Sequence, residues 1–124
     1  MAATADWLTQ TRKGLLELCL LGLVEDGPTY GYEIVTRLAA APPLAAGEGT
    51  IYPLLRRLRE EGWLRTQWKE SPAGPPRQYY ELTPAGRKYL TELRGQWVGL
   101  TGAVESALNG RLKHREKNSS GEER

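Results

Sequence analysis

Apolar residues recur at helical spacing in the first half of the chain, in segments separated by Gly and Pro. Between residues 11 and 25 they occupy nearly every side of a helix. They are Leu15, Leu16, Leu18, Cys19, Leu20, Leu21, Leu23 and Val24. A helix that is apolar nearly all round is buried from several directions. We therefore expect this helix to pack on its own domain along one face and on something else along another.

A second helix is predicted over residues 30–40. Gly27-Pro28 ends the first helix, and Thr29 is positioned to cap the second. Its apolar residues Ile34, Val35 and Leu38 recur at helical spacing. Pro42-Pro43 ends it, because proline disfavours the helical conformation in the residue before it.

A third helix is predicted to begin near Gly47 or Glu48. Its buried stripe consists of Ile51, Leu54, Leu55 and Leu58. Pro53 lies inside this segment and predicts a local kink, since proline removes one helical hydrogen bond. Gly62 is suited to end the helix.

Two strand-like runs follow, over residues 63–69 and 77–82, and residues 70–76 between them are rich in turn formers. This pattern predicts an antiparallel hairpin. Thr83-Pro84 then supplies an N-cap followed by proline at the first helical position, a strong helix start. The last helix is predicted over residues 84–113, and the polar tail 114–124 is predicted to be disordered.

The element order α-α-α-β-β-α predicts a mainly α fold with a small β wing, a winged helix-turn-helix followed by a long C-terminal helix. Helices two and three form the helix-turn-helix and the hairpin forms the wing. The expected organisation is a DNA-binding domain over residues 11–83, a dimerisation helix over 84–113 and a tail over 114–124.

Cysteine and histidine are too scarce for several classes of protein. The 124 residues contain one Cys and one His, so Cys19 forms no internal disulfide and a zinc site is not expected. With one His and one Cys, a catalytic pair of a nucleophile and a histidine base is hardly possible. We expect no enzyme activity, no metal and no cofactor. No apolar run is long enough to cross a membrane and no signal peptide is apparent, which favours the reducing cytoplasm.

The charge lies mainly in the middle of the chain. The net charge is only +2, but residues 47–88 hold eight basic and five acidic side chains, a sum of +3. Aromatic residues are interleaved with these basic groups, a pattern typical of nucleic-acid binding. Charge alone favours the alternative, a solvated surface over ordinary core aromatics.

The first turns of the third helix are the expected site of base contact, as in other helix-turn-helix proteins. Gly49 would let the backbone approach DNA, and Thr50 and Tyr52 offer hydroxyl groups. Arg56 lies one turn beyond Tyr52 and would reach a phosphate. Two further cations, Lys69 and Arg77, flank the predicted tip of the wing.

Four strings in this order resemble the PadR family of transcriptional regulators. They cover residues 30–34 (YGYEI), 49–58 (GTIYPLLRRL), 61–64 (EGWL) and 77–86 (RQYYELTPAG). The resemblance implies a homodimeric winged-helix repressor that binds a palindromic operator in duplex DNA. The chain resembles the small members, which have a single C-terminal helix.

The resemblance also bears on Tyr30 and Tyr32 at the start of the second helix, which would donate hydroxyls to phosphates. The alternative is that one of these rings packs under the hairpin. Tyr79 and Tyr80 alternate along a strand, so one must face inward. The tryptophans Trp63 and Trp68 are predicted to lie in the core.

A stripe of apolar residues at spacings of three or four runs along the last helix and predicts a dimer interface of heptad type. It comprises Leu90, Leu93, Trp97, Leu100, Val104 and Leu108, with Ala107 and Leu112 as neighbours. The over-apolar first helix, with Trp7, fits as the other half of this interface. Gly95, Gly99 and Gly102 share one face and would permit close helix approach or leave room for a ligand.

Small PadR-like proteins include members that hold a flat aromatic ligand at the dimer interface beside a tryptophan of this helix. By resemblance, Trp97 is the candidate contact, with Leu18, Leu93 and Leu100 around it. Glu17 would serve a cationic ligand or face water. Trp97 as plain interface filler remains the alternative. A winged-helix module that binds protein instead of DNA is the competing function.

Overall fold

The computed structural model describes residues 2–112, with side chains from Ala3 onward. They form two compact units divided between Glu92 and Leu93. The first unit therefore runs past the predicted domain boundary at Thr83 and includes the first turns of the last helix. Among the described residues, no helix is long and apolar enough to cross a membrane.

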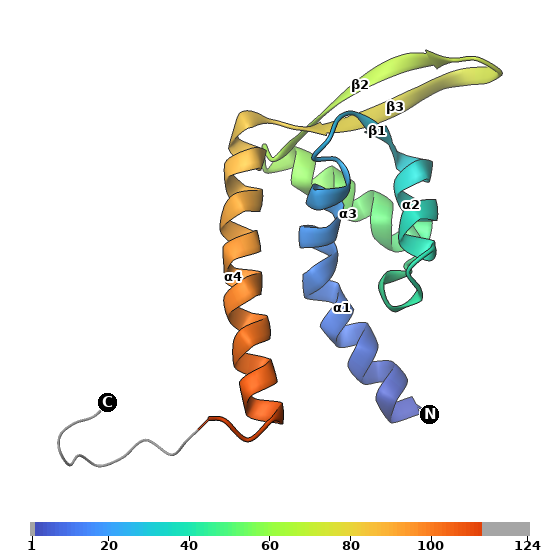
Figure 1. Cartoon of the computed structure of the whole chain (residues 1–124). Helices are drawn as coiled ribbons and strands as arrows, with labels where there is room; N and C mark the ends of the chain where they lie inside the picture. Colours follow the sequence, from blue (N-terminus) through green and yellow to red (C-terminus); the bar gives the residue numbers. More distant parts are fainter. Residues whose placement is uncertain (1, 113–124) are drawn as a thin grey trace. The chain divides into compact units, whose positions relative to one another are not determined.

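The helices and strands of Figure 1 are named in chain order. They are α1 (Ala2–Leu23), β1 (Thr29–Tyr30), α2 (Gly31–Ala39), the short 3₁₀ helix η1 (Pro42–Leu44), α3 (Glu48–Glu60), β2 (Leu64–Ser71), β3 (Gly74–Leu82) and α4 (Pro84–Leu108). The strands form one antiparallel sheet in the order β1-β3-β2. The β2–β3 hairpin runs over α1, α2 and α3, and its tip projects beyond α2 (Figure 1). The mainly α winged-helix fold with a small β wing is confirmed.

The core of the first unit is built from the apolar stripes that the sequence predicts. Helices α1 to α4, the residue after α1 and both long strands contribute buried side chains: Leu16, Leu20, Leu21, Val24, Ile34, Leu38, Ile51, Leu55, Leu58, Leu64, Tyr80, Leu82 and Leu90. Burial of one such aliphatic side chain stabilises the fold by roughly 1.5–3 kcal/mol. Leu54, which the stripe also included, is only half-buried. The residue types of this core thus fix which face of α2 and α3 points inward.

Helix α1 begins at Ala2 and ends at Leu23, so its predicted start at residue 11 is wrong. Residues 2–10 contain neither Gly nor Pro, and alanine is the best helix former. The predicted end at Glu25 is also wrong, because the amide of Glu25 donates to the carbonyl of Gly22 in a turn. Gly27 follows with φ of 151°, in the region that glycine tolerates best.

Thr29 does not cap α2. It lies in β1, opposite Tyr80 of β3, and its hydroxyl donates to the carbonyl of Gly27 at 3.1 Å. The cap position belongs to Tyr30, whose side chain makes no capping hydrogen bond. The predicted two-stranded hairpin is therefore part of a three-stranded sheet, and α2 begins one residue later than expected.

The wing is longer than its turn-forming residues suggested. Strands β2 and β3 reach Ser71 and Gly74, so residues 70–76 are not a loop and only Pro72 and Ala73 form the turn. Between the pairs Lys69–Arg77 and Ser71–Gly74 the register shifts. Prolines 75 and 76 lie at this irregularity, beyond the part of β3 that pairs with β1. Bulges accept prolines because ladder hydrogen bonds are interrupted there.

The predicted helix stops and starts around α3 and α4 are confirmed. Helix α3 continues through Pro53 from Glu48 to Glu60. Gly62 follows with φ of 88°, and the Trp63 amide donates to the carbonyl of Leu58, which closes the helix end. At the start of α4, the Thr83 hydroxyl accepts a hydrogen bond from the Gly86 amide at 2.9 Å.

Helix α4 ends at Leu108, five residues before the predicted end at 113. Gly110 has φ of 69°, and the amide of Arg111 donates to the carbonyl of Ser106 at 2.8 Å. Such a glycine-based stop satisfies the last carbonyls of a helix. Lys113 and the tail 114–124, which the sequence predicts to be disordered, lie outside the described residues.

Candidate nucleic-acid interface

The first turns of α3 present the residues predicted for base contact. Ile51 faces the core, whereas Gly49, Thr50 and Arg56 are exposed. These exposed residues lie on the face of α3 opposite its buried stripe, as expected for an amphipathic helix. This face is therefore free to meet a partner, and it carries a hydroxyl group and a guanidinium.

Tyr52 points away from this exposed face and packs on the start of α2. A Cβ atom at Gly31 would lie only 2.5 Å from Cε1 of Tyr52 and 3.0 Å from its hydroxyl oxygen. Only glycine leaves this space, so Gly31 positions the ring of Tyr52. Burial raises the pKa of Tyr52, and the charge of Glu48 raises it further. The phenol therefore remains protonated at neutral pH and is available as a hydrogen-bond donor.

Tyr52 forms part of a hollow between the hairpin and the first residues of α2, which we call the wing groove. Its volume is about 540 Å³. Its lining is mostly aromatic: Tyr30, Tyr32, Tyr52, Trp68 and Tyr80, together with Gly31, Arg77 and Gln78. The groove is a concave surface to which α3, the start of α2 and the hairpin all contribute.

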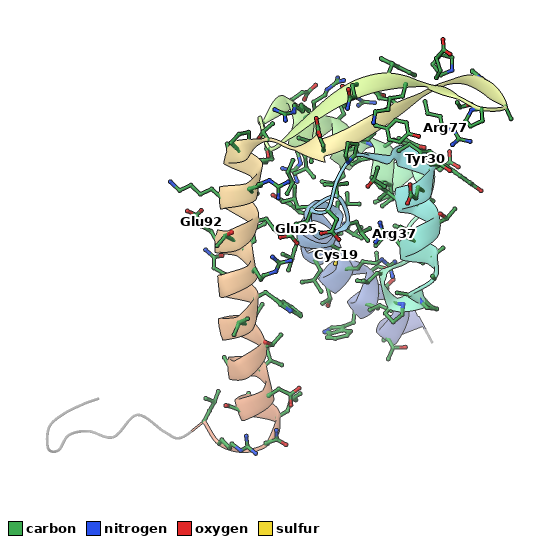
Figure 2. All side chains as sticks on the ribbon, turned by 45° about the horizontal axis from the view of Figure 1, so that its top comes forward. Cys19, Glu25, Tyr30, Arg37, Arg77 and Glu92 are labelled. Atoms are coloured by element: carbon green, nitrogen blue, oxygen red, sulfur yellow. The ribbon has the colours of Figure 1, made fainter. Side chains whose placement is uncertain are left out.

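Arg77 and Lys69 are held on the sheet by aromatic rings. The Arg77 guanidinium carbon lies 4.4 Å from the ring centre of Tyr30, and Lys69 Nζ lies 5.0 Å from that of Tyr79. Figure 2 shows Arg77 on β3 directly above Tyr30. The two cations face each other on the two strands of the hairpin, just before the register shift and the turn at Pro72 and Ala73. Cation–π contacts of this kind restrain long side chains without neutralising them.

The cations of this region divide into paired and unpaired sets. Arg57 contacts Glu17 and Glu61 at 3.1 and 2.9 Å, and Arg65 contacts Glu81 at 2.9 Å. In contrast, four cations form no ion pair within residues 2–112. These are Arg56, Arg59, Lys69 and Arg77. The unpaired cations lie on α3 and on the hairpin, where a polyanion would gain most from them.

Tyr80 connects the two parts of this surface. It is the inward-facing member of the Tyr79–Tyr80 pair, which confirms that one of the two is buried. Burial raises the pKa of Tyr80, and the charges of Arg59 and Arg56 partly offset that rise. Strand β3, which carries Tyr80, therefore lies within electrostatic reach of Arg56 and Arg59 of α3.

Trp68 is not a core residue, which corrects the prediction. It is 67% exposed and lines the wing groove, whereas Trp63 is half-buried and stacks on Tyr89. The alternation of β2 places Trp68 on the same face as the buried Leu64. The sequence did not predict its exposure, because the strand pattern does not show where the hairpin extends beyond the helices.

Glu17 was predicted either to bind a cationic ligand or to face water. In the structure, two side chains of the same chain bind its carboxylate instead. Its carboxylate accepts hydrogen bonds from Arg57 of α3 and from the hydroxyl of Tyr89 in α4. Arg57 also binds Glu61, which accepts a hydrogen bond from the indole of Trp63 at 3.1 Å. Trp63 stacks on Tyr89 with ring centres 4.3 Å apart. These five side chains close a ring that ties α1, α3 and α4 together.

A second hollow, which no sequence pattern predicts, lies at the N-terminal end of α3. It has a volume of about 280 Å³ and is lined by Arg12, Lys13 and Thr50, among others. The guanidinium of Arg12 donates to the carbonyl of Pro43 at 3.2 Å. Basic groups of α1 therefore lie beside the candidate base-contacting threonine.

The second unit contains most of the predicted dimer stripe. Trp97, Leu100, Val104 and Leu108 are exposed, and Leu93 is half-buried. Leu90 is an exception, because it is only 1% exposed inside the first unit and so has no surface to offer a partner. Its assignment to the interface is wrong.

In the first unit, Trp7 on α1 is 68% exposed and Leu18 is half-buried.

In the second unit, Gly95, Gly99 and Gly102 face open space, since an added Cβ would meet nothing within 4 Å. Among the described residues, no group of three metal-ligating side chains is present.

Comparison with known proteins decides the family. The model of the transcriptional regulator PadR-like family matches residues 20–92, more than half of the chain. The chain belongs to the PadR-like family. The match covers α2, α3 and the hairpin, and thus the exposed face of α3 and the wing groove. The resemblance carried by the four strings is confirmed, and members of this family are transcription regulators, not enzymes.

Solved structures of PadR-like proteins are similar along most of the chain. A PadR-like transcription factor from Bacteroides fragilis is 41% identical, with 82% of this chain and 98% of that chain covered and a TM-score of 0.68. A PadR family regulator from Eggerthella lenta is 32% identical, with 86% and 93% covered and a TM-score of 0.77. A PadR-like regulator from Bacillus cereus is 36% identical, with 80% and 96% covered and a TM-score of 0.73.

Proposed function

We propose that this PadR-like regulator is a homodimeric repressor that binds a palindromic site in duplex DNA through α3 and the hairpin. The observation that carries the proposal is the distribution of unpaired cations. Arg56 and Arg59 lie on the same helix as the exposed Thr50. Lys69 and Arg77 form a cross-strand pair on the hairpin, and Arg77 lines the wing groove. Phosphate contacts position such a protein and base contacts specify its site.

The base-contacting group in this proposal is the start of α3, with Gly49 and Thr50, and Tyr52 donates its hydroxyl to a neighbouring phosphate. Thr50 is exposed and Gly49 has open space in front of its backbone. Tyr30, Arg56, Lys69 and Arg77 contact phosphates. The two cations of the hairpin are restrained by rings, so less side-chain entropy is lost when they bind.

The dimer in this proposal forms through the exposed apolar residues of α4, with Trp7 of α1 as a further contact. Trp97, Leu100, Val104 and Leu108 leave a large apolar area uncovered in the single chain. Exposed apolar patches of this kind mark sites of association. Two-fold symmetry would place two copies of α3 on successive turns of the major groove, about 34 Å apart.

The proposal includes release from DNA by a small aromatic ligand held beside Trp97. Trp97 is partly exposed, and Leu18, Leu93 and Leu100 are the apolar residues that would surround the ligand with it. Glu17 is removed from this set, because Arg57 and Tyr89 occupy its carboxylate.

A mobility-shift assay with the DNA upstream of the protein's own gene tests the proposal. The double variant Thr50→Ala/Tyr52→Ala should abolish the specific complex, and Thr91→Ala, which removes an exposed hydroxyl of α4, should leave it intact. Unchanged affinity of the double variant would contradict the site. A protein-docking module is disfavoured, because the exposed face of α3 is cationic and not apolar.

A further inference from the structure

The wing groove presents more exposed aromatic surface than the fold needs. Trp68 is 67% exposed and Tyr32 is 55% exposed, although neither contributes to the core. Trp68 also lies on the β2 face that is buried closer to the helices, where Leu64 is 2% exposed. A large ring on an inward face with nothing over it is suited to hold a binding partner.

We propose that the wing groove seats one phosphodiester strand of the bound DNA, with Trp68 as its outer wall packed on a deoxyribose. Tyr52 and Arg77 would hold the adjoining phosphate. This inference rests on the proposed function and adds to it a strand-binding site and a contact residue.

The polar groups of the groove suit an anion. Arg77 lines the groove without an acidic partner in the described chain, and no carboxylate lines it. Tyr52 is a protonated donor at neutral pH, as any tyrosine of ordinary pKa is, and burial raises its pKa further. Gln78 accepts a weak hydrogen bond of 3.4 Å from Tyr80, which leaves its amide group free to donate. Neutral donors around one guanidinium match the oxygens of a phosphodiester.

The position of the groove favours a nucleic-acid strand over a small molecule. Tyr52 belongs to the same helix as Thr50 and Arg56, so the groove adjoins the helix that the proposal places on DNA. The opposite wall is the hairpin, whose Arg77 lines the groove beside Tyr30. Aromatic side chains bind nucleic acid without regard to sequence, as a wall of this kind requires.

Fluorescence anisotropy with a labelled duplex of mixed sequence, about 30 base pairs long, separates these contributions. The affinity is measured from roughly 50 to 300 mM KCl, because the slope against salt counts the phosphate contacts of cations. Trp68→Ala should weaken binding at least about fivefold at every salt concentration and leave the slope unchanged, since the indole is neutral. Arg77→Ala should instead lower the slope by about one per protomer.

Two further variants show that the effect of Trp68→Ala arises from the lost ring. Trp68→Phe should restore most of the affinity because it retains an aromatic face. Gln67→Ala, an exposed change on the opposite face of β2, should bind as the parent protein does. All of these variants should unfold at the temperature of the parent, because the substituted side chains lie outside the core.

The outcomes distinguish this inference from the proposed function. If Trp68→Ala binds like the parent while Arg56→Ala binds more weakly, the groove is not a strand site, although α3 still binds DNA. If the parent protein fails to bind duplex DNA at low salt, the proposed function itself is refuted.

A second readout identifies the occupant. In protein labelled with 5-fluorotryptophan, DNA should shift the ¹⁹F resonance that Trp68→Phe removes, and it should leave that of Trp7 in place. A shift caused by naphthalene-2-carboxylate but not by DNA would make the groove a small-molecule site and overturn the inference.

Discussion

The contact between Gly31 and Tyr52 makes a sharp prediction about how the recognition surface is positioned. In Gly31→Ala, the new Cβ would lie 2.5 Å from Cε1 of Tyr52, where ordinary contacts begin at 3.4 Å. The ring must therefore retreat by about 1 Å. That displacement takes a hydroxyl out of a hydrogen bond whose normal length is about 2.7 Å. Loss of one hydrogen bond to a charged group costs roughly 1.5–3 kcal/mol, or about 10- to 150-fold in affinity for each bound protomer.

The stability of the same variant should hardly change. The ring of Tyr52 can swing into the wing groove, and alanine is favoured over glycine in a helix by up to about 1 kcal/mol. We expect the free energy of unfolding of Gly31→Ala to stay within about 1 kcal/mol of the parent. Binding and folding thus respond differently to one methyl group.

A double-mutant cycle measures this coupling. DNA affinity is determined by anisotropy, and stability by urea unfolding, for the parent, Gly31→Ala, Tyr52→Ala and the double variant. In the Tyr52→Ala background there is no ring to displace, so Gly31→Ala should have no further effect on affinity. An equal loss of affinity in both backgrounds would refute the reasoning, because Gly31 would then act without Tyr52.

Other features give predictions that single measurements check. Gly86→Ala should lower the free energy of unfolding by about 1–3 kcal/mol in a urea titration, because its Cβ would clash with the carbonyl of Trp63; a neutral result would contradict this. The hydrogen bond to Glu17 raises the pKa of Tyr89 to about 12, above that of an unfolded tyrosine near 10. The contribution of this hydrogen bond to the free energy of unfolding is present below pH 10 and is lost as the pH rises towards 12. Tyr89→Phe should therefore make the free energy of unfolding less dependent on pH in that range. Leu100→Arg should yield a monomer in sedimentation analysis, and an unchanged dimer would exclude α4 from the interface.

The sequence predicted the helices well because their apolar stripes have a clear period. The residues that close α3 and open α4, Gly62 and Thr83, were also recognised, since each capping role has a distinctive residue type. The start of α1 was missed because residues 2–10 carry no apolar stripe, although they contain three alanines and neither Gly nor Pro. Strand β1 was missed because two residues are too few to show a period.

The candidate site was predictable only in part. Thr50 and Arg56 are exposed on α3 as the stripe of buried residues implied. The exposure of Trp68 depends on how far the hairpin extends past the helices, which no local pattern records. The role of Glu17 depends on partners 40 and 72 residues away, Arg57 and Tyr89. Long-range contacts of this kind come from tertiary packing and leave no signal in sequence spacing.

The central claim is that this PadR-like chain reads a two-fold symmetric DNA site with two copies of α3. Selection of bound sequences from a pool of random duplexes, with purified protein, tests it most directly. The account predicts enrichment of one inverted repeat whose half-sites lie about 10 base pairs apart, and loss of that enrichment in Thr50→Ala/Tyr52→Ala. Recovery of sequences with no shared repeat, or the same repeat from both proteins, would contradict it.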